Sequence, residues 1–193
     1  MKAICVYCGS SDNISGEYLD AARQMGGVIA NRGLQVVYGA GSTGLMGAIA
    51  AGALAANGEV IGVIPAIFNT PQLAHNSLTR LEVVETIHIR KARMIELADA
   101  FVALPGGFGT LEELFEILTW AQIGLHHKPV GLLNTLRYFD PLLTMIEHAY
   151  TQGFIYTEHR DLYTQAGEPE ALLERLLNHR PASGPNRWLD RNS

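Results

Sequence analysis

Short apolar runs rich in β-branched residues alternate along this chain with longer segments of helical periodicity. The runs with the length and composition of strands are residues 3–8, 35–38, 60–64, 81–84, 100–104 and 130–133. Helical patterns follow them at residues 18–31, 45–57, 90–98, 111–123, 138–152 and, more weakly, 169–178. Strands that are apolar throughout and separated by helices indicate a parallel sheet covered on both faces. We therefore predict a doubly wound, Rossmann-like α/β fold with a mostly parallel sheet and helices on both faces.

The length of the chain indicates one domain. With 193 residues, 48% of them apolar, it can bury one sizeable core but is short for two. We expect residues 1–180 to form a single Rossmann-like domain and residues 181–193, which hold Pro, Ser, Gly and Asn, to form a flexible tail. Residues 65–78 are the longest irregular stretch, and we expect them to form a loop over the ligand site.

The charge pattern argues against two classes of partner. The net charge is -5, and the 14 basic residues are scattered along the chain rather than blocked. We therefore expect neither nucleic acid nor an anionic membrane surface as a partner, while a small ligand remains open. No window holds about 18 apolar residues, and the N-terminus lacks the pattern of a signal peptide, so we expect a cytosolic protein.

Cysteine and histidine do not suggest a metal or redox site. Cys5 and Cys8 have C-x-x-C spacing, but both fall in a predicted strand. Their side chains would then point to opposite faces about 10 Å apart, too far for a disulfide, so we interpret them as buried thiols. The seven histidines show neither H-x-x-x-H nor H-E-x-x-H spacing, and we predict no bound metal.

Two glycine-rich turns follow predicted strands, where doubly wound folds bind ligands. The first reads YGAGSTGLMG at residues 38–47, and three of its glycines fit G-x-G-x-x-G: Gly39, Gly41 and Gly44. A dinucleotide site fits badly, because the turn follows the second strand and the nearest acidic residue precedes the third strand rather than ending it. Two interpretations remain: a phosphate site with Ser42 and Thr43 as hydroxyl donors, or a tight turn needed for close packing.

The second turn lies in the segment LPGGFGTLEELFE at residues 104–116. It lacks the lysine of a Walker sequence, so it is not an NTP-hydrolysing P-loop. A helix is predicted to begin near Thr110, with a core stripe that turns its carboxylates away from the core. The members of that stripe are Leu111, Leu114, Phe115 and Leu118, and the carboxylates are Glu112, Glu113 and Glu116. Thr110 and Glu113 also fit a capping box, so Glu113 is either a helix cap or a catalyst.

A compact basic cluster, Arg90-Lys91-Ala-Arg93, opens the next predicted helix upstream. Cations in the first turn of a helix oppose its macrodipole, which costs about a few tenths of a kcal/mol. Either a bound anion compensates for this charge or the cluster is a solvated face.

The segment PGGFGTLEE at residues 105–113 matches the signature P-G-G-x-G-T-x-x-E, and on this ground the chain resembles the Lonely Guy family of cytokinin riboside 5′-monophosphate phosphoribohydrolases. Similar blocks follow in family order at residues 8–11, 38–47, 88–94 and 119–130, and the similarity reaches about residue 163. Members release free base and ribose 5-phosphate from nucleoside 5′-monophosphates. The resemblance implies this hydrolysis of AMP or N6-modified relatives, with water as co-substrate, no cofactor and a homodimer.

The same resemblance implies roles for individual residues. Arg90 and Glu113 form the catalytic pair, with Glu112 as a second carboxylate. The residues implied to bind the nucleotide are Gly9, Ser10, Gly39, Gly41, Ser42, Thr43, Gly44, Met46, Lys91, Met94, Pro105, Gly106, Gly107, Phe108, Gly109, Thr110 and Thr119. After Pro65 the chain reads Ala-Ile-Phe, which departs from the family pattern and leaves the preferred base open.

The implied reaction makes physical sense of these residue types. A carboxylate beside C1′ can stabilise an oxocarbenium-like transition state and activate water. Binding of the 5′-phosphate holds the sugar in place. Lysine decarboxylation, a name given to many relatives, would need a Schiff-base lysine for pyridoxal phosphate. Of Lys2, Lys91 and Lys128, only Lys91 could serve, and we reject that activity. A non-catalytic nucleotide carrier or sensor remains the alternative, followed by a dinucleotide oxidoreductase.

Overall fold

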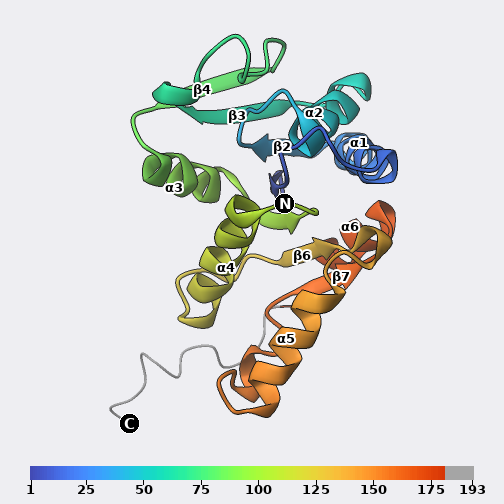
Figure 1. Ribbon diagram of the computed structural model, residues 1–193, viewed down its shortest axis with the longest axis vertical. Coiled ribbons are helices and arrows are strands. Elements are labelled where there is room, and N and C mark those ends of the chain that lie inside the picture. The colour runs from blue at the N-terminus through green and yellow to red at the C-terminus, as the bar shows by residue number, and fades with distance from the viewer. Residues whose placement is uncertain (181–193) are drawn as a thin grey trace.

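The computed structural model describes residues 1–180, in which parallel strands form one sheet between two layers of helices (Figure 1). The strands are β1 (Ala3–Tyr7), β2 (Gln35–Tyr38), β3 (Val60–Pro65), β4 (Arg80–Val84), β5 (Ala100–Ala103), β6 (Val130–Leu133) and β7 (Thr164–Ala166). The helices are α1 (Gly16–Asn31), α2 (Gly44–Ala55), α3 (Ile87–Leu97), α4 (Phe108–Gln122), α5 (Asp140–Thr151) and α6 (Pro169–Leu177). The predicted tail at residues 181–193 lies outside the described residues.

The strand order confirms the doubly wound fold. It runs β4-β3-β2-β1-β5-β6-β7, and each neighbouring pair of strands is parallel. The chain builds outward from β1 to β4 on one side and then from β5 to β7 on the other. The order therefore reverses beside β1, and in such sheets ligands bind where the order reverses, at the carboxyl ends of the strands.

The two faces of the sheet carry separate apolar clusters. Along β1, Ile4 and Val6 pack in the cluster that includes residues of α1, α2 and α6, whereas Cys5 and Tyr7 pack with residues of α3 and α4. Figure 1 shows α1 and α2 on the opposite side of the sheet from α3 and α4. Cys8 lies in the first cluster, so both cysteines are buried, free and on opposite faces, as predicted.

The largest differences from the prediction are at the starts of α3 and α4 and at one strand. α3 and α4 begin three residues earlier than expected, at Ile87 and Phe108. Their first residues do not continue the apolar periodicity, which is why the pattern did not include them. The strand β7 was not predicted, because Thr-Gln-Ala is short and lacks an apolar run; it is ordered by pairing with β6.

The loop at residues 65–78 packs on the first glycine-rich turn. The N–H of His75 donates to the carbonyl of Ala40 at 2.9 Å, and the N–H of Ser42 donates to the carbonyl of Leu73 at 2.9 Å. The loop therefore lies beside the carboxyl edge of the sheet, where the site was expected. Within residues 1–180, no helix combines the length and apolar character needed to cross a membrane.

Candidate functional site

The turns after β1, β2 and β5 are hydrogen-bonded to one another at the carboxyl edge of the sheet. The N–H of Gly9 donates to the carbonyl of Pro105 at 3.0 Å. The carbonyl of Gly9 accepts from the N–H groups of Leu45 at 3.0 Å and Met46 at 3.3 Å. The hydroxyl of Thr43 donates to the carbonyl of Ser10 at 2.8 Å. These bonds fix the turns after β2 and β5 on either side of Gly9.

In the first glycine-rich turn, the amides at the start of α2 are already occupied. The N–H groups of Leu45 and Met46 donate to the carbonyl of Gly9, and the N–H of Gly44 donates to the Asp12 carboxylate at 2.8 Å. An anion at the N-terminus of α2 would therefore compete with a carboxylate of the protein itself. The hydroxyl of Ser42 is also used internally, on the carbonyl of Gln72 at 3.4 Å. Of the two interpretations of this turn, close packing is the one that its contacts support.

Close packing at Gly39 makes room for the side chain of Arg90. A Cβ at this position would lie 2.0 Å from Nη2 of Arg90 and 2.5 Å from the methyl carbon of Met46. The absence of a side chain thus leaves room for the Arg90 guanidinium over the end of β2.

The N-terminus of α4, by contrast, is open. Its N-cap is Gly107, and no side chain caps it. The carbonyls of Pro105 and Gly107 accept hydrogen bonds from Gly9 and Leu111, but within residues 1–180 no acceptor takes the N–H groups of residues 106–110. Gly106 allows the tight turn, because a Cβ there would lie 2.1 Å from Oγ1 of Thr110. Free amides at a helix N-terminus form an anion site.

Arg90 of α3 and Glu113 of α4 meet beside this anion site. Their Nη2 and Oε1 atoms are 3.3 Å apart, and the side chains are only 13% and 10% exposed. Burial raises the pKa of Glu113 to about 7, although the positive charge of Arg90 acts to lower it. Nε of Arg90 is buried and has no hydrogen-bond partner among the described residues. A buried donor in this condition fits an acceptor supplied by a ligand.

The structure excludes one alternative for α4 and corrects one prediction. Because α4 begins before Thr110, the capping box that was the alternative role of Glu113 does not form. The helix is also rotated from the predicted stripe: Thr110, Glu113 and Leu114 are buried, whereas Phe115 is 44% exposed. Glu113 therefore faces the protein interior and contacts Arg90 instead of capping a helix.

The basic cluster on α3 is compensated by carboxylates of the protein. Lys91 is buried and its Nζ donates to Glu112 and, at 3.0 Å, to Glu116. Arg93 pairs with Glu82 at 2.7 Å. Glu112 is thus bound to Lys91 on the seam between α3 and α4, and its side chain is 56% exposed. Within residues 1–180, no group of His, Cys, Asp and Glu has the arrangement of a metal site.

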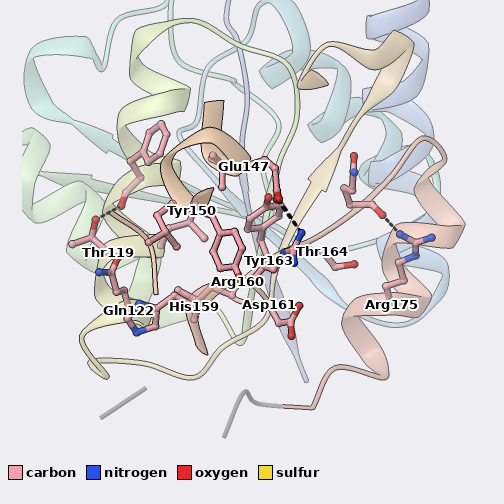
Figure 2. Close-up of a pocket in the computed structure, with 16 residues that line it drawn as sticks. Thr119, Gln122, Glu147, Tyr150, His159, Arg160, Asp161, Tyr163, Thr164 and Arg175 are labelled. Carbon is pink, nitrogen blue, oxygen red and sulfur yellow. Dashed lines mark hydrogen bonds and ion pairs between the residues drawn. The ribbon is translucent and has the colours of Figure 1, made fainter. Parts of the chain in front are cut away.

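Two of the residues implied to bind nucleotide lie away from this edge. Met94 is fully buried in the core cluster formed with α4 and one face of the sheet. Thr119 lies nine residues beyond Thr110 on α4, about 13 Å along the helix. It lines a different cavity of about 370 Å³ between α4, α5 and the segment before β7 (Figure 2). Its hydroxyl donates to the carbonyl of Phe115 at 2.7 Å.

Among the cavity-lining residues that the sequence analysis missed, Tyr138 makes a hydrogen bond to the glycine turn. Tyr138, which follows β6, lines a cavity of about 370 Å³ together with Gly9, Ser10, Gly106 and Gly107. Its hydroxyl donates to the carbonyl of Gly106 at 2.6 Å. No motif marks this tyrosine in the sequence, because its partner is remote along the chain.

The sequence was compared with known proteins. The pattern of a family described as "Possible lysine decarboxylase" matches residues 46–176. A probable cytokinin riboside 5′-monophosphate phosphoribohydrolase of Oryza sativa subsp. japonica is 44% identical over 190 residues, covering 96% of this chain and 90% of that protein. The cytokinin riboside 5′-monophosphate phosphoribohydrolase of Rhodococcoides fascians is 51% identical over 155 residues, covering 80% and 78%. The chain belongs to the Lonely Guy family.

Solved structures also resemble this Lonely Guy protein. A molybdenum cofactor binding protein from Rippkaea orientalis matches with a TM-score of 0.69 and 25% identity, covering 90% of this chain and 94% of that one. A molybdenum cofactor carrier protein from Chlamydomonas reinhardtii matches with a TM-score of 0.68 and 23% identity, covering 91% and 97%. The latter similarity shows the fold alone.

Proposed function

We propose that this protein hydrolyses the N-glycosidic bond of nucleoside 5′-monophosphates, releasing free base and ribose 5-phosphate. The observation that carries the proposal is the buried pair of Arg90 and Glu113, with Glu113 in the second turn of α4 after its uncapped N-terminus. The curated relatives are named for this activity on cytokinin riboside 5′-monophosphates. We therefore propose AMP and its N6-modified derivatives as the substrate class.

In the proposed mechanism the 5′-phosphate binds the free amides of residues 106–110, with the positive end of the α4 dipole behind them. This contact holds the ribose so that C1′ lies near Glu113. As the C–N bond breaks, positive charge develops on the sugar, and the ionised Glu113 carboxylate stabilises it and accepts a proton from the attacking water. Arg90 keeps the carboxylate in place and offers its unpartnered Nε to the substrate.

Other residues implied by the resemblance support the site in this proposal through packing and ion pairs. Gly9 and Gly39 give the close packing of the turns, and Ser10 lines the cavity beside Gly106. Lys91 and Glu112 connect α3 to α4 and so fix the relative position of Arg90 and Glu113. The homodimer is also proposed on the resemblance, and sedimentation velocity of the purified protein will measure it.

The test is a product assay. Purified protein is incubated with AMP, N6-prenylated AMP and adenosine, and free base and ribose 5-phosphate are measured by chromatography. We expect release of base from the monophosphates and little from adenosine, because adenosine lacks the anchoring phosphate. Binding of AMP without release of base from any monophosphate would support the carrier alternative, to which the structural similarity with a molybdenum cofactor binding protein also points.

The buried carboxyl predicts a pH profile. Because the reaction uses ionised Glu113, kcat/KM for AMP should rise with pH and then level off, and the midpoint of the rise should lie at about pH 7. The free energy of unfolding should depend on pH in the opposite direction. Because the pKa of Glu113 in the folded protein lies above the ordinary value of 4.5, the group stabilises the native state below pH 4.5. This contribution is lost as pH rises to about 7. Initial rates and thermal melts between pH 5 and 9 measure both, and a kcat/KM independent of pH would contradict the assignment.

A further inference from the structure

The turn that carries Tyr138 has an unusual backbone. Leu136 and Arg137, which precede it, both have positive φ, at 51° and 61°. Residues other than glycine are sterically disfavoured at positive φ, and two of them in succession are rare. Neither residue is placed there for its own packing, since Leu136 is 54% exposed and the Arg137 side chain 86%. Strained backbone of this kind is retained where the conformation serves a function.

A hydrogen-bond network holds the strained turn in place. The amide of Asn134 donates to Asp140 at 2.8 Å and to the side chain of Gln165 at 3.1 Å, and its oxygen accepts from the N–H of Phe139 at 2.7 Å. Arg137 pairs with the same Asp140 at 2.6 Å. The network thus joins the two ends of the turn to β7 and determines the direction in which Tyr138 leaves it.

The result of this arrangement is the contact between Tyr138 and the glycine turn. The hydroxyl of Tyr138 donates to the carbonyl of Gly106 at 2.6 Å. The adjacent carbonyls of Pro105 and Gly107 accept from Gly9 at 3.0 Å and from Leu111 at 3.1 Å. Every carbonyl from residue 105 to residue 107 therefore has a donor within the protein, while the amides of residues 106–110 have no acceptor among the described residues.

We propose that Tyr138 is a positioning residue for the phosphate contact of the proposed reaction. In a trans peptide the C=O and N–H point in opposite directions. By holding the Gly106 carbonyl on its own side, the Tyr138 hydroxyl directs the N–H of Gly107 away from itself and toward the anion site. It also keeps a carbonyl dipole from turning toward the phosphate, where it would repel the anion. The proposal rests on the proposed function, because it assigns a role in binding its phosphate.

Tyr138→Phe tests the proposal, because it removes the hydroxyl and keeps the ring. We expect KM for AMP and the inhibition constant of ribose 5-phosphate to rise together by about three- to tenfold, the effect of losing one neutral hydrogen bond. We expect kcat to change by less than about twofold, since the reacting groups are untouched. A purely structural role would instead lower the melting temperature without separating KM from kcat.

Tyr150→Phe is the matched control. Tyr150 of α5 lines the other cavity, away from the glycine turn, and its hydroxyl makes no hydrogen bond within the described residues. This variant should keep the wild-type constants. Unchanged constants in Tyr138→Phe, or an equal change in Tyr150→Phe, would overturn the role of the Tyr138 hydroxyl alone. Wild-type protein that ribose 5-phosphate does not inhibit would overturn the phosphate contact, and this inference with it.

Discussion

Glu113→Gln should reduce kcat for AMP hydrolysis by about a thousandfold and leave the Kd for AMP close to the wild-type value. Glutamine keeps the shape of the side chain but can neither accept a proton from water nor carry the negative charge that opposes an oxocarbenium ion. Loss of a general base alone is worth about 10²–10⁴ in rate. Binding survives because the phosphate contact uses the amides of residues 106–110. Single-turnover assays and calorimetric titration with AMP measure the two quantities.

Glu112→Gln provides the matched control for that experiment. Glu112 is the neighbour of Glu113 in sequence, but its side chain is 56% exposed and bound to Lys91. Its replacement should change kcat by no more than a few-fold, because the Glu112 carboxylate is half exposed and Lys91 keeps its ion pair with Glu116 on α4. If Glu112→Gln lost as much activity as Glu113→Gln, the two carboxylates would have to share the catalytic role.

The fold could be predicted from the sequence because it depends on patterns that are local. β1, β5 and β6 are apolar throughout, as is β2 after Gln35, and each is followed by a helical pattern. Their burial on both faces can therefore be inferred without any contact. The short edge strand β7 could not be predicted in this way. Its pairing with β6 comes from tertiary structure, and its composition carries no strand signal.

The site could be predicted only in part. Glycine spacing marked both turns alike, and their difference is a matter of hydrogen bonds: Asp12 and Gly9 occupy the amides of α2, whereas those at the start of α4 have no such partners. The pairing of Arg90 with Glu113 was implied by family resemblance, not by periodicity. Periodicity in fact predicted the wrong face for Glu113, because a buried carboxylate interrupts an apolar stripe.

Arg90→Met separates the two roles that the structure gives to this arginine. The pair is buried, so removing the guanidinium leaves the Glu113 carboxyl without its counter-charge in a desolvated position. Because Arg90 acts to lower the pKa of Glu113, the midpoint of the kcat/KM profile should move upward from about 7 by at least about one pH unit. At pH 7 we expect a loss of about a hundredfold or more, which combines the smaller ionised fraction with the lost contact to the substrate. Initial rates with AMP between pH 5 and 10 measure both effects.

Arg93→Met is the matched control for Arg90→Met. Arg93 lies on the same helix, but it pairs with Glu82 at 2.7 Å and Glu96 at 3.1 Å, away from Glu113. Its removal should leave the pH midpoint near the wild-type value and kcat/KM within a few-fold, because Arg93 contacts neither Glu113 nor the turn before α4. A loss of activity in Arg90→Met with an unmoved midpoint would mean that Arg90 acts on the substrate alone. Equal losses in both variants would trace the effect to the stability of α3, because only Arg90 shares a contact with the carboxylate.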